Sequence, residues 1–243
     1  MSIMCCVYTP DGIVLAADSR LTRTRTTNIT SSKENDNIEK IIIENTTYTL
    51  SDNAQKVMLL KKNCVGISFC GDAIIQGINV SDFIRKFEIE LVSDDDTTEI
   101  IAEKLCKYYN DTKTIFFVCG YDNDIPYVYD IINKTVNRQN IIEYNEKDNT
   151  NINDKYDRIK YSAIWNGHKT AITKFINGEP SINLDFNTMP LKDSIEFAEF
   201  LVDLTIKYER FSDDIQTCGG PIDVLVITKD EAYWVNHKIY KEK

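Results

Sequence analysis

Three residues near the start of the chain have the types and order needed for nucleophilic catalysis without a histidine. Ser2 becomes the N-terminal residue if Met1 is removed, and an N-terminal Ser can use its own α-amine as the general base. The pKa of an α-amine is about 8, and a nearby lysine lowers it by like-charge repulsion. Lys56 is the candidate for that lysine, and Asp18 is the candidate carboxylate that holds it in place.

The opening stretch contains the element that would bring Ser2 and Asp18 together. An apolar run over 1–9 reaches a Pro-Asp-Gly turn at 10–12, and a second apolar run returns to Asp18. This pattern predicts a buried β-hairpin with Ser2 and Asp18 at its open end. Lys56 begins the next predicted strand. Because chain termini usually fray, a catalytic role for residue 2 would explain why this terminus is tied into a strand.

The other reactive side chains fit structural roles better. His168 lies beside an Asn-Gly turn and His237 in a charged tail, without a nucleophile motif nearby, so both are expected on the surface. Cys5 and Cys6 are rival nucleophiles, but they fall inside the first predicted strand and have no free amine. We therefore predict that both are buried thiols.

Length and charge narrow the class of protein. The chain has 243 residues, 42% of them hydrophobic, which is enough for one large domain over 1–243. Its net charge of −10 argues against a nucleic-acid-binding protein, which needs clustered Lys and Arg. No apolar run is long enough for a membrane span, and the N-terminus lacks the basic region of a signal peptide. A cytoplasmic protein without a membrane partner is therefore the expectation.

Metal and cofactor binding are not expected. The seven cysteines are odd in number and lie mostly in apolar runs, which favours free thiols over a disulfide framework. A CxxC pair is absent and the chain has only two histidines, so no structural zinc site is predicted.

The hydrophobic pattern predicts strands, then helices, then strands again. Asp72 is predicted to cap a helix that runs to Leu91. Residues 21–50 are predicted as an inserted loop or hairpin, and residues 142–158 as a polar surface loop. Runs of one element type indicate an α+β fold in which two packed sheets have helices outside. The other predicted strands are 55–60, 64–71, 114–120, 127–132, 161–165, 222–228 and 231–236, and the other predicted helices are 97–110, 170–176 and 191–208.

Within the insertion, a short hairpin is predicted. Its strands would be Lys40–Glu44 and Thr46–Leu50, with the turn between them.

Five motifs occur in order along the chain: Asp11–Arg20, Asp52–Val57, Gly66–Ala73, Phe116–Asp122 and Gly219–Val224. With this ordered set the chain resembles the proteasome β-type family of N-terminal nucleophile hydrolases, and within it bacterial proteasome-related members of the Anbu or HslV kind. Counting back from the first motif without gaps places the family's catalytic N-terminal threonine on Ser2.

The resemblance implies a four-layer αββα sandwich, a homo-oligomer of rings or stacked rings, and amide-bond hydrolysis through an acyl-enzyme on Ser2. It places backbone N–H groups around Ser68, just before Gly71, at the oxyanion hole. Arg20 would brace the site. Neither the ring size nor an ATPase partner follows from the sequence.

The chain also departs from the family pattern. The nucleophile is Ser rather than Thr, and the insertion over 21–50 is long. The family places an Asp three residues before a Ser-Gly-Gly, whereas here Cys218 precedes the Gly-Gly and Asp214 is one residue out of register. Asn166 stands in the turn that is Gly-Ser-Gly-like in the family.

Three functions therefore remain open. The first is a peptidase with Ser2 as nucleophile, and the second is a small-molecule amidase of the same fold with the insertion as a lid. The third is a catalytically silent, proteasome-like structural subunit. Retention of Met1 would favour the third, because Ser2 would then have no free amine.

Overall fold

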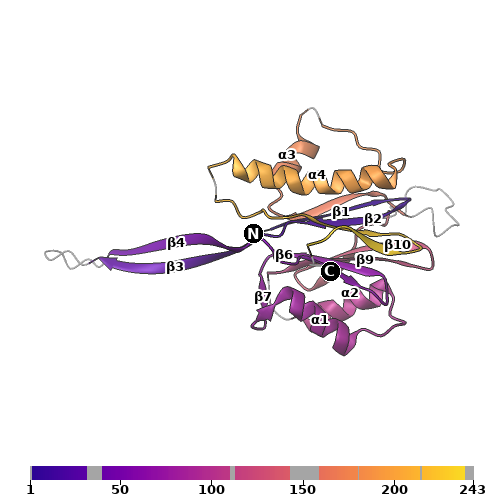
Figure 1. The fold of residues 1–243 in the computed structure, drawn as a ribbon, viewed down its shortest axis with the longest axis horizontal. Helices are drawn as coiled ribbons and strands as arrows, with labels where there is room; N and C mark the ends of the chain where they lie inside the picture. Colours follow the sequence, from indigo (N-terminus) through magenta and orange to yellow (C-terminus); the bar gives the residue numbers. More distant parts are fainter. Residues whose placement is uncertain are drawn as a thin grey trace, which may run out of the picture.

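The computed structural model describes residues 2–31, 40–109, 113–142, 159–179, 181–213 and 215–238, with side chains described outside 28–44. Figure 1 shows a layered body from which one long strand pair projects. No helix among these residues is long and apolar enough to span a membrane.

One sheet carries both ends of the described chain. Its strand order is β12-β1-β2-β13-β14, and every neighbouring pair is antiparallel. The outer face of this sheet is covered by helices α3 (Thr170–Asn177) and α4 (Leu191–Arg210), which pack on it through a buried apolar cluster (Figure 1). The strands are β1 (Ile3–Thr9), β2 (Gly12–Ala17), β12 (Ser162–Gly167), β13 (Asp223–Ile227) and β14 (Ala232–Asn236).

A second sheet has the strand order β11-β10-β9-β6-β5 and is also antiparallel. Helices α1 (Val80–Leu91) and α2 (Thr98–Tyr108) cover its outer face, with Phe83 and Phe87 fully buried against it. The strands are β5 (Val57–Leu60), β6 (Val65–Cys70), β9 (Ile115–Asp122), β10 (Ile125–Ile132) and β11 (Thr135–Arg138).

The inner faces of the two sheets pack on each other. Alternate residues of β1 and β2, among them Met4, Cys6 and Leu15, meet Phe117 and Cys119 of the second sheet in one buried cluster. Both faces of each sheet are therefore covered, as the near-continuous apolar runs of the first strands require. The fold is the four-layer αββα sandwich that the sequence predicts.

The opening hairpin is confirmed, and its register places Asp18 opposite Ile3, the residue after Ser2. Met4 pairs with Ala17 across β1 and β2. One residue further out, the Asp18 N–H donates to the Ile3 carbonyl at 3.2 Å. All residues of both strands are buried, so the start of the chain is an inner strand of the sheet.

The insertion over 21–50 is a single long hairpin, and the predicted short hairpin is wrong. Strand β3 (Leu21–Ser31) pairs along its length with β4 (Lys40–Ser51). Lys40–Glu44 and Thr46–Leu50, which were expected to pair with each other, thus lie in one strand. The threonines at 22, 24, 46, 47 and 49 favour extended backbone on both arms.

The helix predicted to begin at Asp72 starts later. Two short strands, β7 (Ile74–Ile75) and β8 (Ile78–Asn79), come first. They are joined at Gln76 and Gly77, which both have positive φ, of 52° and 83°. A two-residue turn with both residues at positive φ is the ordinary hairpin connection, and it postpones α1 to Val80.

The remaining elements agree with the prediction to within a few residues, except that β11 was not foreseen. Most of the predicted polar loop, at 143–158, lies outside the described residues.

Candidate active site

A buried ion pair forms the centre of the candidate site. Lys56 Nζ lies 2.7 Å from Asp18 Oδ1, and the two side chains are 5% and 0% exposed. Asp18 Oδ1 also accepts the Ile3 N–H at 3.0 Å, while Oδ2 accepts the N–H groups of Gly219 at 3.0 Å and Arg20 at 3.1 Å. Four donors thus occupy the acceptor positions of a carboxylate, which is how a buried charge is compensated.

Ser2 is held beside this pair by the turn after β12. The Ser2 carbonyl accepts the backbone N–H of His168 at 2.7 Å. Gly167 has φ +104°, and a Cβ there would overlap the Ser2 carbonyl oxygen. Glycine is therefore required at 167, both for the backbone conformation and for the close approach of Ser2.

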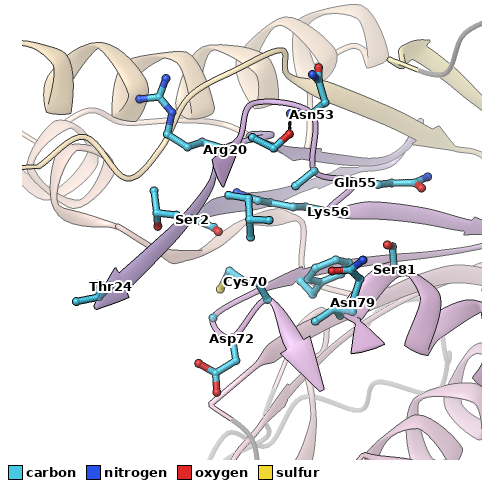
Figure 2. A pocket seen from close by; sticks show the side chains of 18 residues that line it. Ser2, Arg20, Thr24, Asn53, Gln55, Lys56, Cys70, Asp72, Asn79 and Ser81 are labelled. Atoms are coloured by element: carbon cyan, nitrogen blue, oxygen red, sulfur yellow. Dashed lines mark hydrogen bonds between the residues drawn. The ribbon is translucent and has the colours of Figure 1, made fainter. Parts of the chain in front are cut away.

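Ser2 and Lys56 line the same cavity, of about 530 Å³. In Figure 2 the amino end of Lys56 is turned toward Ser2, and Asp72 and Asn79 lie on the opposite side of the opening. Most other lining side chains are polar or small, so the cavity offers many hydrogen-bonding groups. They come from the base of the β3–β4 hairpin, the segment before β5, the end of β6 and the start of α1: Arg20, Leu21, Thr22, Thr24, Ser51, Asn53, Ala54, Gln55, Phe69, Cys70, Gly71, Ala73, Val80 and Ser81.

Arg20 lies on the cavity wall and is fixed by Asp52. Its Nε donates to Asp52 Oδ1 at 2.7 Å and its Nη2 to Oδ2 at 3.1 Å. This two-pronged contact raises the pKa of Arg20 and lowers the pKa of Asp52. Gly219 packs directly against the guanidinium group. Arg20 thus ties the start of β3 to the segment before β5 and to the loop that holds Asp18.

Of the two residues predicted near the oxyanion hole, Gly71 lines the cavity and Ser68 does not. Gly71 lines the cavity and has φ +114°, with no room for a side chain against the Lys113 carbonyl. Ser68 does not line it: its hydroxyl is fully buried between the sheets and points at Met4 Sδ, 3.5 Å away. Its side chain faces the inner layer because strand residues alternate between the two faces of a sheet.

Two other predicted supporting residues are Asn166, which does not line the cavity, and Asp214. Asn166 pairs with Met4 across the sheet, and its Oδ1 accepts the Gly167 N–H at 2.7 Å, so it shapes the turn that holds Ser2. Asp214 lies outside the described residues.

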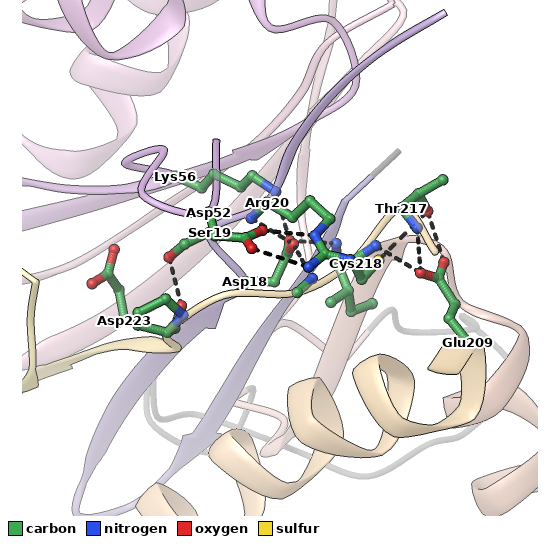
Figure 3. Close-up of polar contacts among 12 residues, drawn as sticks. Asp18, Ser19, Arg20, Asp52, Lys56, Glu209, Thr217, Cys218 and Asp223 are labelled. Atoms are coloured by element: carbon green, nitrogen blue, oxygen red, sulfur yellow. Dashed lines mark hydrogen bonds and ion pairs between the residues drawn. The ribbon is translucent and has the colours of Figure 1, made fainter. Parts of the chain in front are cut away.

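Glu209, in the last turn of α4, is a buried carboxylate that the sequence analysis missed. It accepts the Thr217 N–H at 2.7 Å, the Thr217 hydroxyl at 2.7 Å and the Cys218 N–H at 2.6 Å (Figure 3). Cys218 is fully buried, and the next residue, Gly219, donates to Asp18. Glu209 therefore positions the loop that positions Asp18. The only sequence signal was an acidic residue near a helix end, which is too common to identify it.

The two histidines are only partly exposed and lie against carboxylates, which corrects the expectation of surface histidines. The His168 side chain is 18% exposed, with Nδ1 2.8 Å from Glu209 Oε1. The His237 side chain is 12% exposed, stacks on Trp234 with ring centroids 3.7 Å apart, and has Nδ1 3.3 Å from Asp223 Oδ1. Both follow strand ends whose polar character suggested solvent, but buried carboxylates lie beside them.

Of the seven cysteines, Cys64 is exposed, Cys106 is partly exposed and the others are buried. Cys5 and Cys6 are fully buried, as predicted, and burial raises the pKa of Cys5 to about 12. Cys70, which no sequence motif marks as a nucleophile, lines the cavity. Burial raises the pKa of Cys70 to about 12 against the opposing effect of Lys56. A thiol with that pKa is a poor nucleophile at neutral pH.

Comparisons with known proteins bear on the fold. No protein-family model matches the chain, and no curated protein matches it. Among solved structures, the Anbu (Gly-1) mutant from Hyphomicrobium sp. strain MC1 matches over 98% of this chain and 86% of that chain. The TM-score is 0.57 and the sequence identity 12%. The relation is thus one of fold, and it agrees with the kind of relative that the sequence motifs resemble.

Proposed function

We propose that this chain is an N-terminal nucleophile hydrolase that cleaves amide bonds in peptides, with Ser2 as the nucleophile after removal of Met1. The observation that carries the proposal is the buried Asp18–Lys56 pair, of which Lys56 lines the same cavity as Ser2. The fold shared with the Anbu structure supports it, as does the ordered set of sequence motifs.

The chemistry follows from the positions of these groups. The freed α-amine takes the Ser2 hydroxyl proton while Oγ attacks the scissile carbonyl. The ammonium group of Lys56, paired with Asp18, favours the neutral amine by like-charge repulsion. The Gly71 N–H, at the cavity wall, is the candidate donor to the oxyanion. The ammonium then gives its proton to the leaving amine, and water hydrolyses the ester with the α-amine again as base.

The hairpin bears on the size of the substrate. β3 and β4 extend away from the body in Figure 1, and only residues at their base line the cavity. A hairpin that projects in this way does not close over the cavity as a lid. This favours a peptide, which needs an open cleft, over the small amide that a lidded site would suit. A homo-oligomer is part of the proposal, by analogy with the family that the motifs resemble.

The test combines intact mass with active-site labelling. Loss of Met1 from the purified chain is expected, followed by covalent labelling of Ser2 by a peptide vinyl sulfone or epoxyketone. Ser2→Ala is the matched control and should remain unlabelled. Retention of Met1 would favour the silent structural subunit, and labelling at Cys5, Cys6 or Cys70 would overturn the assignment of the nucleophile.

A further inference from the structure

An imidazole, a carboxylate and a thiol meet beside Asp18, outside the Ser2 cavity. The donor atoms of His168, Glu209 and Cys218 all lie within 4.8 Å of one another. They belong to three separate segments: the turn after β12, the last turn of α4 and the loop before β13. We propose that these three side chains bind a zinc ion.

The first observation in favour concerns His168. Its Nδ1 is buried and has no hydrogen-bond partner among the described residues. It lies 2.8 Å from Glu209 Oε1, but the direction of the ring nitrogen does not meet the oxygen as a hydrogen bond requires. Because buried polar atoms are nearly always satisfied, an unpartnered nitrogen needs an explanation. A metal ion accepting its lone pair provides one.

The second observation concerns the free acceptor position on Glu209. Oε2 accepts two backbone N–H groups, from Thr217 and Cys218. Oε1 accepts the Thr217 hydroxyl and no other hydrogen bond among the described residues. A carboxylate oxygen has about two acceptor positions, so one remains on Oε1, the oxygen that faces His168. Glu209 can therefore coordinate a metal without releasing the loop that it holds.

The donor set selects the cation. A thiolate and an imidazole are ligands that Zn²⁺ prefers, whereas Mg²⁺ and Ca²⁺ require oxygen ligands. On binding, Cys218 gives its thiol proton to solvent, and the thiolate and Glu209 together balance the charge of the ion. Three protein ligands leave a fourth position for water, and the partly exposed His168 marks the side from which the ion enters.

The position of the cluster gives metal binding a structural consequence. The backbone N–H of His168 donates to the Ser2 carbonyl, and the backbone N–H of Gly219, the residue after Cys218, donates to Asp18. An ion bound to the His168 and Cys218 side chains would link the two segments that position Ser2 and Asp18. The site itself does not depend on hydrolysis, so its test is independent of the proposed function.

The experiment measures Zn²⁺ binding to the full chain after treatment with a chelator and dialysis. We expect one equivalent to bind in calorimetry and to raise the melting temperature. We also expect Co²⁺ to produce a thiolate-to-metal absorption band. Cys218→Ser and His168→Asn should each weaken binding by roughly 10²-fold. Cys64→Ser, which removes an exposed thiol, is the matched control and should bind as the wild type does.

Two results would overturn the proposal. One is a wild-type chain that binds no stoichiometric zinc. The other is binding that survives in both Cys218→Ser and His168→Asn, or is lost in Cys64→Ser, which would place the ion at the surface. The two ligand variants are used together because a buried substitution at Cys218 could by itself prevent folding.

Discussion

Lys56 Nζ lies 2.7 Å from Asp18 Oδ1, and neither side chain has more than 5% of its surface exposed. The lysine directly precedes β5, in one sheet, and the aspartate directly follows β2, in the other. The pair therefore joins the two sheets at the point where the chain begins. A buried ion pair is weak evidence for stability, because the cost of removing both charges from water offsets their attraction. The pair therefore supports the proposed catalytic role.

Breaking this pair should be costly. Lys56→Met leaves Asp18 buried without its counter-charge and should lower the free energy of unfolding by about 3–5 kcal/mol. Adding Asp18→Asn should cost less than the sum of the two single changes, because the double variant has no unpaired charge. Urea unfolding measures each value. Lys62→Met, which breaks the exposed pair with Asp94, is the control and should leave stability nearly unchanged. Full additivity in the cycle would contradict this account.

The choice of Ser rather than Thr at position 2 should limit the rate. A threonine methyl restricts rotation about χ1 and keeps Oγ aimed at the substrate. Ser2→Thr is therefore expected to cleave the same peptide faster than the wild type, by a factor of a few. Ser2→Ala should lose roughly 10³-fold or more of kcat. Steady-state kinetics on a fluorogenic peptide measures both variants. A Ser2→Thr variant slower than the wild type would contradict the prediction.

Two glycines that both have positive φ should respond differently to alanine. Gly167 has φ +104° and no room for a methyl group against Ser2, whereas Gly77 has φ +83° and nothing within 4 Å. Gly77→Ala should cost only the strain of positive φ, about 1 kcal/mol. Gly167→Ala adds a clash with the Ser2 carbonyl and should cost at least twice as much and reduce activity. Thermal melts of the two variants compare them directly, and equal losses would contradict the proposed packing of Ser2.

The Cys70 thiol should react slowly although it lines the cavity. Its pKa of about 12 leaves about one thiolate in 10⁵ at pH 7. Alkylation of Cys70 by iodoacetamide should therefore rise with pH through 10 without a plateau near 8.5. The exposed Cys64 is expected to react first. Peptide mapping over a pH series separates the two. Rapid modification of Cys70 at pH 7 would make it a competing nucleophile.

Local patterns in the sequence were sufficient for the hairpin that carries Ser2 and Asp18. An apolar run, a Pro-Asp-Gly turn and a second apolar run specify two buried paired strands, and pairing alone brings the ends together. Such patterns were less informative where two conformations compete. Asp72 is a good helix cap, but the turn at Gln76-Gly77 forms a strand pair first. The threonine-rich insertion is likewise one long hairpin rather than a short one.

The sequence by itself determined the layered fold and the terminal hairpin, and it identified Ser2, Asp18 and Lys56 as candidate catalytic residues. Only the tertiary structure placed Glu209 behind the loop of Cys218, brought His168 to both and turned Ser68 away from the cavity. The physical reason is distance along the chain. Contacts such as the one between Gly219 and Asp18, 201 residues apart, depend on helix length and on the order of strands in the sheet. Neither leaves a local pattern of residues.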